Sequence, residues 1–197
     1  MGRWEPNARG RLAQAALDLY EERGFEQTTA AQIAERAGLT ERTFFRHYRD
    51  KREVLFEGAP ALAKFFVDTL TDIPDSVLPI DAIASTLESV ATFFEERHTF
   101  ARQRQAVIIA NTELRERELV KLASLAAALA ATLRGRGVPE PAATLTAEAG
   151  ITVFKVGFER WVGQDGDRTL AHFLRESLAE LRTVTAGRQP APAADGS

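Results

Sequence analysis

Residues 28–48 read TTAAQIAERAGLTERTFFRHY and predict two short helices joined by a tight turn. Thr29 and Gln32 form a capping-box pattern, in which each side chain bonds the free backbone N–H of the other residue at the start of the first helix. Gly38 ends that helix where a left-handed residue is favoured. Thr40 is then a good N-cap for the second helix. Two short helices around a glycine-containing turn are typical of the helix-turn-helix motif.

The second helix is predicted to have one buried face and one exposed face. At 3.6 residues per turn, Phe44 and Tyr48 lie on the same side and are expected in the core. The remaining large side chains are predicted to project outward: Glu41, Arg42, Phe45 and Arg46. In a helix-turn-helix protein the second helix enters the major groove of DNA with its N-terminal side chains first. We therefore expect this exposed face to meet DNA.

Helical patterns continue on both sides of this motif, and strand signals are weak, so the fold class is predicted to be all-α. A helix over residues 8–23 comes before the motif and stops at Gly24. A second capping box, Asp50 to Glu53, opens a fourth helix, which Pro60 is expected to kink or divide. Further helices are predicted over residues 79–94, 100–110, 112–135, 141–163 and 167–185.

This pattern predicts a domain organisation in three parts. Residues 1–56 form a three-helix helix-turn-helix DNA-binding domain, and residues 57–186 form a helical ligand-binding and dimerisation domain. Residues 187–197 are rich in Ala, Pro and Gly and are expected to be disordered.

Charge and composition favour a site-directed contact with DNA over bulk attraction to it. The net charge is −3, yet residues 36–52 carry six Lys or Arg and only two Asp or Glu. An ordinary solvated charged face remains the alternative on charge alone. The chain has no cysteine, no secretory signal pattern and no run of 18 apolar residues, so we expect a cytoplasmic protein without a membrane-spanning helix.

The run from Thr28 to Leu55 resembles the DNA-binding domain of TetR-family regulators. Several elements occur in order: the Gly-Phe turn at 24–25, the Thr cap, Ile-Ala, Ala-Gly-Leu, and an aromatic-rich helix followed by Asp-Lys. The resemblance covers residues 8–56. It implies a regulator that binds a double-stranded DNA operator, expected to be an inverted repeat, as a homodimer.

The resemblance also implies roles for individual residues. Thr29 and Thr40 are expected as caps and phosphate contacts, and Lys51 as a phosphate contact. Phenylalanine cannot donate the hydrogen bond that a family tyrosine often supplies at position 45, so an apolar contact with a thymine methyl is the alternative there. The full predicted DNA-binding set is Thr29, Thr40, Glu41, Arg42, Thr43, Phe45, Arg46, His47 and Lys51.

In the family, the C-terminal domain binds a ligand between its helices and dimerises through its last two long helices, here 141–163 and 167–185. The candidate ligand-binding residues are Phe65, Phe66, Phe93, Phe94, Phe100, Arg104, Ile108, Phe154, Phe158 and Trp161. Plain core packing is the alternative for each aromatic. The segment from Arg102 resembles actinobacterial regulators with an acyl-CoA-like ligand domain. Arg102 or Arg104 would then meet an anionic head group, with ordinary surface arginines as the alternative.

An enzyme is the rival class, and the residues give it little support. The three histidines are isolated, and neither a phosphate-binding loop nor a nucleophile motif occurs, so no catalytic residue, metal site or cofactor is predicted. A DNA-binding architectural protein without an effector is the third alternative. Our prediction is a regulator, most commonly a repressor in this family, that a small apolar or acyl-type effector releases from its operator. Activation instead of repression stays open.

Overall fold

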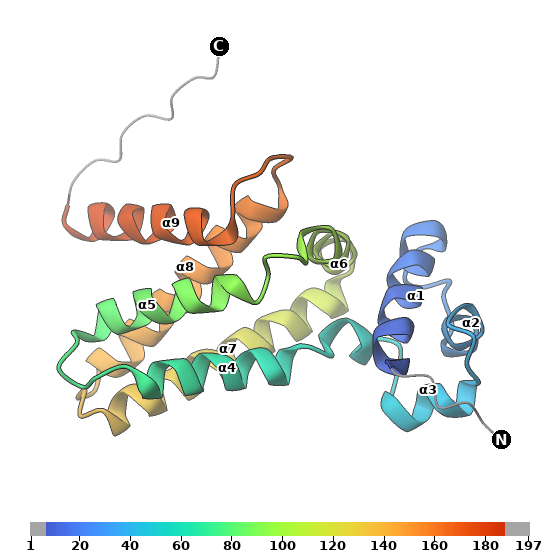
Figure 1. Cartoon of the computed structure of the whole chain (residues 1–197), viewed down its shortest axis with the longest axis horizontal. Coiled ribbons are helices and arrows are strands. Elements are labelled where there is room, and N and C mark those ends of the chain that lie inside the picture. The colour runs from blue at the N-terminus through green and yellow to red at the C-terminus, as the bar shows by residue number, and fades with distance from the viewer. Residues whose placement is uncertain (1–6, 188–197) are drawn as a thin grey trace, which may run out of the picture. The chain divides into compact units, whose positions relative to one another are not determined.

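The computed structural model describes residues 7–187, and within that range every regular element is helical (Figure 1). The elements are α1 (Ala8–Arg23), α2 (Ala30–Arg36), α3 (Glu41–His47), the 3₁₀ helix η1 (Glu53–Phe56), α4 (Ala59–Asp72), α5 (Pro79–Thr92), α6 (His98–Ala110), α7 (Thr112–Gly135), α8 (Ala142–Val162) and α9 (Leu170–Thr185). The all-α prediction is confirmed. The tail predicted to be disordered lies, from residue 188 onward, outside the described residues.

The chain divides into two compact units. The head unit comprises residues 7–62 and 99–121, and the body unit comprises residues 63–98 and 122–187. α6 and the start of α7 thus belong with the N-terminal helices, and α4 and α7 contribute to both units. The division into domains after residue 56 stays a prediction.

Local caps shape the head unit as the sequence predicted. Thr29 and Gln32 make both hydrogen bonds of the capping box at α2, and the Thr40 hydroxyl accepts from the Thr43 N–H at the start of α3. Gly38 has a φ of 66°, the left-handed conformation that lets the chain turn between the two helices. The predicted turn is therefore confirmed.

The predicted fourth helix is divided in two. Asp50 accepts from the N–H groups of Arg52 and Glu53, as a cap would, but only the short η1 follows. Pro60 lies in the first turn of α4, where its missing N–H costs no helical hydrogen bond. The proline thus divides the segment and helps to start α4.

Glycines allow the helices of the body unit to pack closely. A Cβ on Gly157 of α8 would lie 3.2 Å from the backbone nitrogen of Leu174 on α9. A Cβ on Gly150 would lie 2.6 Å from a methyl group of Ile83 on α5. α8 therefore approaches α9 backbone to backbone, which a larger residue at position 157 would prevent.

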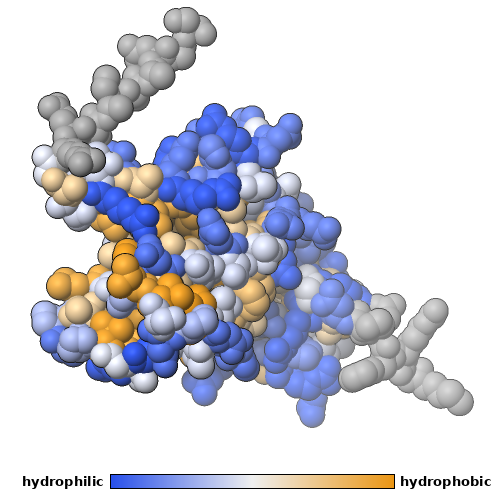
Figure 2. Space-filling view, turned by 60° about the vertical axis from the view of Figure 1, so that its left-hand side comes forward, coloured by the Kyte–Doolittle hydropathy of each residue, from blue (hydrophilic) through white to orange (hydrophobic). Residues whose placement is uncertain are grey.

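Most of the apolar stripe on α9 is buried within the subunit. Leu170, Phe173, Leu174 and Leu178 are all buried without any partner chain. Four large apolar side chains of the body unit stay exposed: Leu78, Leu145, Val156 and Val184. Figure 2 shows apolar side chains gathered in a hollow on one face of the molecule. Within residues 7–187, no helix combines the length and apolar composition that a membrane span requires.

Candidate nucleic-acid interface and ligand-binding region

The helix-turn-helix is held by a compact core and by polar bonds between its helices. Phe44, Tyr48 and Ile33 are buried, and Phe44 packs against Tyr48 with ring centroids 5.5 Å apart. The Arg36 guanidinium of α2 donates two hydrogen bonds, of 2.8 and 2.7 Å, to the Glu22 carboxylate of α1. This pair also holds the pKa of the Glu22 carboxyl below its ordinary value. α2 and α3 are thus fixed on α1 as a scaffold.

The outward face of α3 has the composition that the sequence predicted. Glu41, Arg42 and Arg46 are exposed, and the Phe45 side chain is 53% exposed. The Phe45 ring lies edge-on to the Phe44 ring, with centroids 5.4 Å apart, and leaves about half of its own surface open to a partner. Thr43 is half-buried, and its hydroxyl lies 3.0 Å from that of Thr40. Together these side chains form a mixed cationic and apolar surface.

His47 is the last residue of α3, and its side chain is partly removed from solvent. Its ring is half-buried, and its Nε2 atom is buried without a hydrogen-bond partner. Burial lowers the pKa of His47, Arg46 and Arg9 lower it further, and Glu57 opposes them. The neutral imidazole is therefore favoured in the folded protein.

Lys51 differs from the simple phosphate contact that we expected. Its ammonium group donates to the carbonyl oxygens of Phe25 (2.7 Å), Glu26 (3.2 Å) and Thr28 (3.0 Å). It also lies 4.3 Å from the centroid of the Phe25 ring. The Tyr20 hydroxyl donates to the Lys51 carbonyl at 2.7 Å. Lys51 thus fastens the turn between α1 and α2, and a phosphate contact would have to share its three protons.

The candidate ligand-binding residues separate into two groups. Seven aromatic side chains of the body unit form one continuous cluster through ring contacts of 5.4 to 6.3 Å: Phe65, Phe66, Phe93, Phe94, Phe154, Phe158 and Trp161. His98 is not isolated, contrary to the prediction from sequence, because its ring lies edge-on to that of Trp161 with centroids 4.8 Å apart. No signal in the sequence joined residues 63 positions apart.

The other three candidates, Phe100, Arg104 and Ile108, lie on α6 in the head unit. Ile108 is buried among its core side chains, and Phe100 packs against them. Arg104 donates its Nε–H to the Leu55 carbonyl at 2.6 Å and pairs with Glu118 at 2.7 Å. A guanidinium used in this way ties α6 and α7 to η1. A ligand contact for these three residues stays a prediction, and the effector proposed below is placed on the aromatic cluster of the body unit.

Two protein-family matches cover most of the chain. Residues 12–57 match the family described as "Bacterial regulatory proteins, tetR family", and residues 77–186 match the family described as "MftR C-terminal domain". The second match alone covers more than half of the chain.

Curated relatives and a solved structure agree with these matches. The HTH-type transcriptional regulator TcmR of Streptomyces glaucescens is 35% identical over 82 residues, 42% of this chain and 36% of that protein. The putative mycofactocin biosynthesis transcriptional regulator MftR of Mycobacterium tuberculosis is 26% identical over 114 residues, 58% of each chain. The chain therefore matches less than two thirds of either relative's length. Thermus thermophilus FadR, a TetR-family transcriptional repressor solved with lauroyl-CoA, has the same fold, with a TM-score of 0.57 and 24% identity over 95% of this chain and 100% of that one.

Proposed function

Because the chain belongs to the TetR family of bacterial regulatory proteins, we propose that it is a ligand-responsive transcriptional repressor. In this proposal it acts in the cytoplasm as a homodimer on a DNA operator. The observation that carries the proposal is the exposed face of α3, where Arg42, Phe45 and Arg46 project from a short helix that is rigidly capped and packed. Such a helix can enter the major groove without first being ordered.

The side chains of α3 suit different parts of the operator. Arg42 lies in the first turn, so it is the candidate for a bidentate bond to guanine O6 and N7. Arg46, one turn later, is the candidate for a phosphate contact. Phe45 offers an apolar surface to a thymine methyl group. Glu41, Thr43 and His47 complete the proposed face, with Thr29 and Thr40 as phosphate contacts beside their capping roles.

The dimer interface is proposed on the outer faces of α8 and α9. Val156 of α8 and Val184 of α9 stay exposed in the subunit, as does Leu145 near the start of α8. Leu178 is buried within its own subunit, so a charge at that position would test folding before it tested association. A two-fold axis there would present two copies of α3 to successive major grooves, which requires an inverted-repeat operator.

The effector is proposed to be lipophilic and acyl-like. Seven contiguous aromatic side chains in one helical unit offer a large apolar surface, of which Phe65, Phe93 and Phe94 remain only half-buried. FadR, which shares the fold, was solved with lauroyl-CoA. An effector of this kind lowers operator affinity only if it binds the DNA-free arrangement more tightly than the DNA-bound one.

Operator selection from random DNA tests the first half of the proposal. We expect the selected sequences to contain an inverted repeat, bound by a protein of dimer mass. Val156→Glu should yield a monomer with much weaker operator binding, whereas Leu78→Glu, an apolar-to-acidic change at the exposed N-cap of α5, should leave the mass unchanged. Selected sequences without symmetry, or a wild-type monomer at micromolar concentration, would contradict the proposal.

Titration with lauroyl-CoA tests the second half. Free protein should bind it more tightly than operator-bound protein, by the same factor by which it weakens operator binding, because linkage is reciprocal. Phe94→Ala, at the centre of the aromatic cluster, should weaken this binding. Phe100→Ala in the head unit is the matched control and should retain it. Equal affinity for free and operator-bound protein would refute release by this effector.

A further inference from the structure

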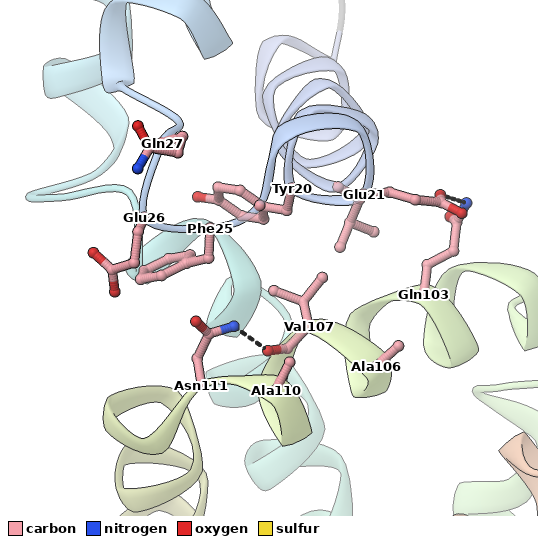
Figure 3. Close-up of a pocket in the computed structure, with 12 residues that line it drawn as sticks. Tyr20, Glu21, Phe25, Glu26, Gln27, Gln103, Ala106, Val107, Ala110 and Asn111 are labelled. Atoms are coloured by element: carbon pink, nitrogen blue, oxygen red, sulfur yellow. Dashed lines mark hydrogen bonds between the residues drawn. The ribbon is translucent and has the colours of Figure 1, made fainter.

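A cavity lies wholly within the head unit, between α6 and the end of α1 with the turn that follows it. Its volume is about 400 Å³. Figure 3 shows Tyr20 and Phe25 above it and Val107, Ala106 and Ala110 below it. Sites for small molecules commonly span about 300–1,000 Å³. The space is therefore large enough for a small ligand of about a dozen water-sized groups, at roughly 30 Å³ each.

Small residues keep this cavity open while its walls stay fixed. Two of the side chains that α6 places along it, Ala106 and Ala110, are single methyl groups, and Gly24, with a φ of 83°, adds no side chain. Behind these residues, Ile108 of α6 and Leu17 of α1 belong to the same buried core. The two walls are thus joined through that core, and the space between them does not depend on a loose segment.

The rim of the cavity is acidic and rich in hydrogen-bond acceptors. Among its twelve lining residues are two glutamates, Glu21 and Glu26, and no lysine or arginine. At one end the Gln103 amide donates to the Glu21 carboxylate at 3.1 Å (Figure 3). At the other end the Asn111 amide donates to the Val107 carbonyl at 2.7 Å, which leaves the Asn111 side-chain oxygen as an acceptor. Such a rim attracts a cation that carries N–H donors.

The aromatic wall suits the same kind of group. The Tyr20 and Phe25 rings meet edge-on with centroids 5.1 Å apart, and a ring face attracts a cation. The turn that carries Phe25 already binds one ammonium group, that of Lys51, through three carbonyl oxygens and the Phe25 ring. Lys51 does not line the cavity, but its positive charge repels a second ammonium group at the Phe25 end, so the Glu21 end is the favoured place for one.

We propose that this cavity binds a small hydrophobic ammonium compound, with an aromatic or short aliphatic body against Tyr20, Phe25 and Val107 and its protonated amine at the Glu21 carboxylate. The site is separate from the aromatic cluster of the body unit, and its acidic rim disfavours an anionic acyl effector. Binding here requires neither an operator nor the proposed effector.

The probe is 2-phenylethylammonium, compared with phenylacetate and 2-phenylethanol, which have the same body but carry a negative or no charge. Titration of the isotope-labelled full chain, without DNA, should show saturable chemical-shift changes confined to residues 17–27 and 103–111. A fragment of this size is expected to bind with a dissociation constant on the order of a millimolar. The ammonium compound should bind roughly 3- to 10-fold more tightly than 2-phenylethanol, because exposed carboxylates contribute modestly.

Two variants locate the site and its charge preference. Ala106→Leu fills the cavity from an exposed helix position that tolerates leucine, and it should lower ammonium affinity at least tenfold. Glu21→Gln with Glu26→Gln should lower ammonium affinity roughly 3- to 10-fold and leave 2-phenylethanol binding unchanged. Glu35→Gln, on the exposed face of α2, is the charge-matched control.

The outcomes separate this proposal from the proposed function. Absence of saturable shifts in the wild type, or equal binding of phenylacetate, would overturn it. Binding that persists in Ala106→Leu would place the probe elsewhere and overturn it as well. None of these results affects operator binding, which is measured without the probe.

Discussion

Replacing Lys51 by methionine should destabilise the protein by about 2–3 kcal/mol. The ammonium group makes three hydrogen bonds to carbonyl oxygens, of 2.7 to 3.2 Å, and contacts the Phe25 ring. Hydrogen bonds that involve a charged group contribute about 1.5–3 kcal/mol each when buried. Lys51 is only half-buried, and water can replace part of the lost hydrogen bonding. The expected loss of stability is therefore well below the sum of three such hydrogen bonds.

Thermal and urea unfolding at fixed protein concentration measure this change. A loss of 2–3 kcal/mol lowers the melting temperature of a chain of this size by roughly 5–10 °C. Methionine keeps most of the aliphatic stem, so the change reports the ammonium group. Arg49→Met removes an exposed cation two positions earlier and should shift the melting temperature by no more than about 1 °C.

The same variant separates a structural role from a role in DNA binding. If Lys51 only fastens the turn, the salt dependence of operator binding stays as in the wild type while the protein remains folded. If it also reaches a phosphate, the salt slope falls by about one. A loss of stability below about 0.5 kcal/mol would refute the argument that the three carbonyl bonds hold the turn.

The operator-facing arginines, the His47 ring and the glycines of α8 can each be tested by substitution. Arg42→Ala should relax discrimination at one base pair by roughly 1–3 kcal/mol, whereas Arg46→Ala should weaken binding to all sequences alike, as measured on a panel of single-base operator variants. The pKa of His47 is lower in the folded than in the unfolded chain, so the unfolded chain binds more protons below about pH 6.5. Urea unfolding between pH 7.5 and 5 should therefore show stability falling as the pH falls, less steeply in His47→Gln. Gly157→Ala should cost about 1–2 kcal/mol, because the new methyl meets the α9 backbone, and Gly150→Ala should cost a similar amount in the same assay, because its methyl meets the buried, β-branched Ile83.

The sequence specified the local geometry of the head unit well, for a physical reason. Caps and turns are set by residues within four positions of each other, so Thr29, Gly38 and Thr40 could be assigned from spacing alone. The buried and exposed faces of α3 likewise follow from helical period. Which side chains of the exposed face contact DNA stays a prediction. The helical period shows which side chains point outward, but it does not show what they bind.

Hydrogen bonds between residues far apart in the chain could not be predicted from the sequence. Lys51 bonds carbonyls 23 to 26 positions earlier in the chain, and Arg104 bonds a carbonyl 49 positions earlier. A basic side chain next to a DNA-binding motif is expected to face DNA, yet a backbone turn with unsatisfied carbonyls competes for the same cation. A sequence pattern identifies the basic side chain, but it does not identify the distant backbone carbonyls that bind it instead.

The three ligand candidates on α6 show what a helical period leaves undetermined. Phe100, Arg104 and Ile108 are spaced four apart and do share one face of α6, so the pattern was interpreted correctly up to that point. The same apolar face can cover an effector or complete another core, and only the tertiary structure distinguishes the two. In this chain it completes the core of the head unit, with Ile108 buried there and Arg104 bonded to the Leu55 carbonyl. Substitutions along this face should therefore alter the stability of the DNA-binding helices directly, even though the face lies more than forty residues beyond the helix-turn-helix in sequence.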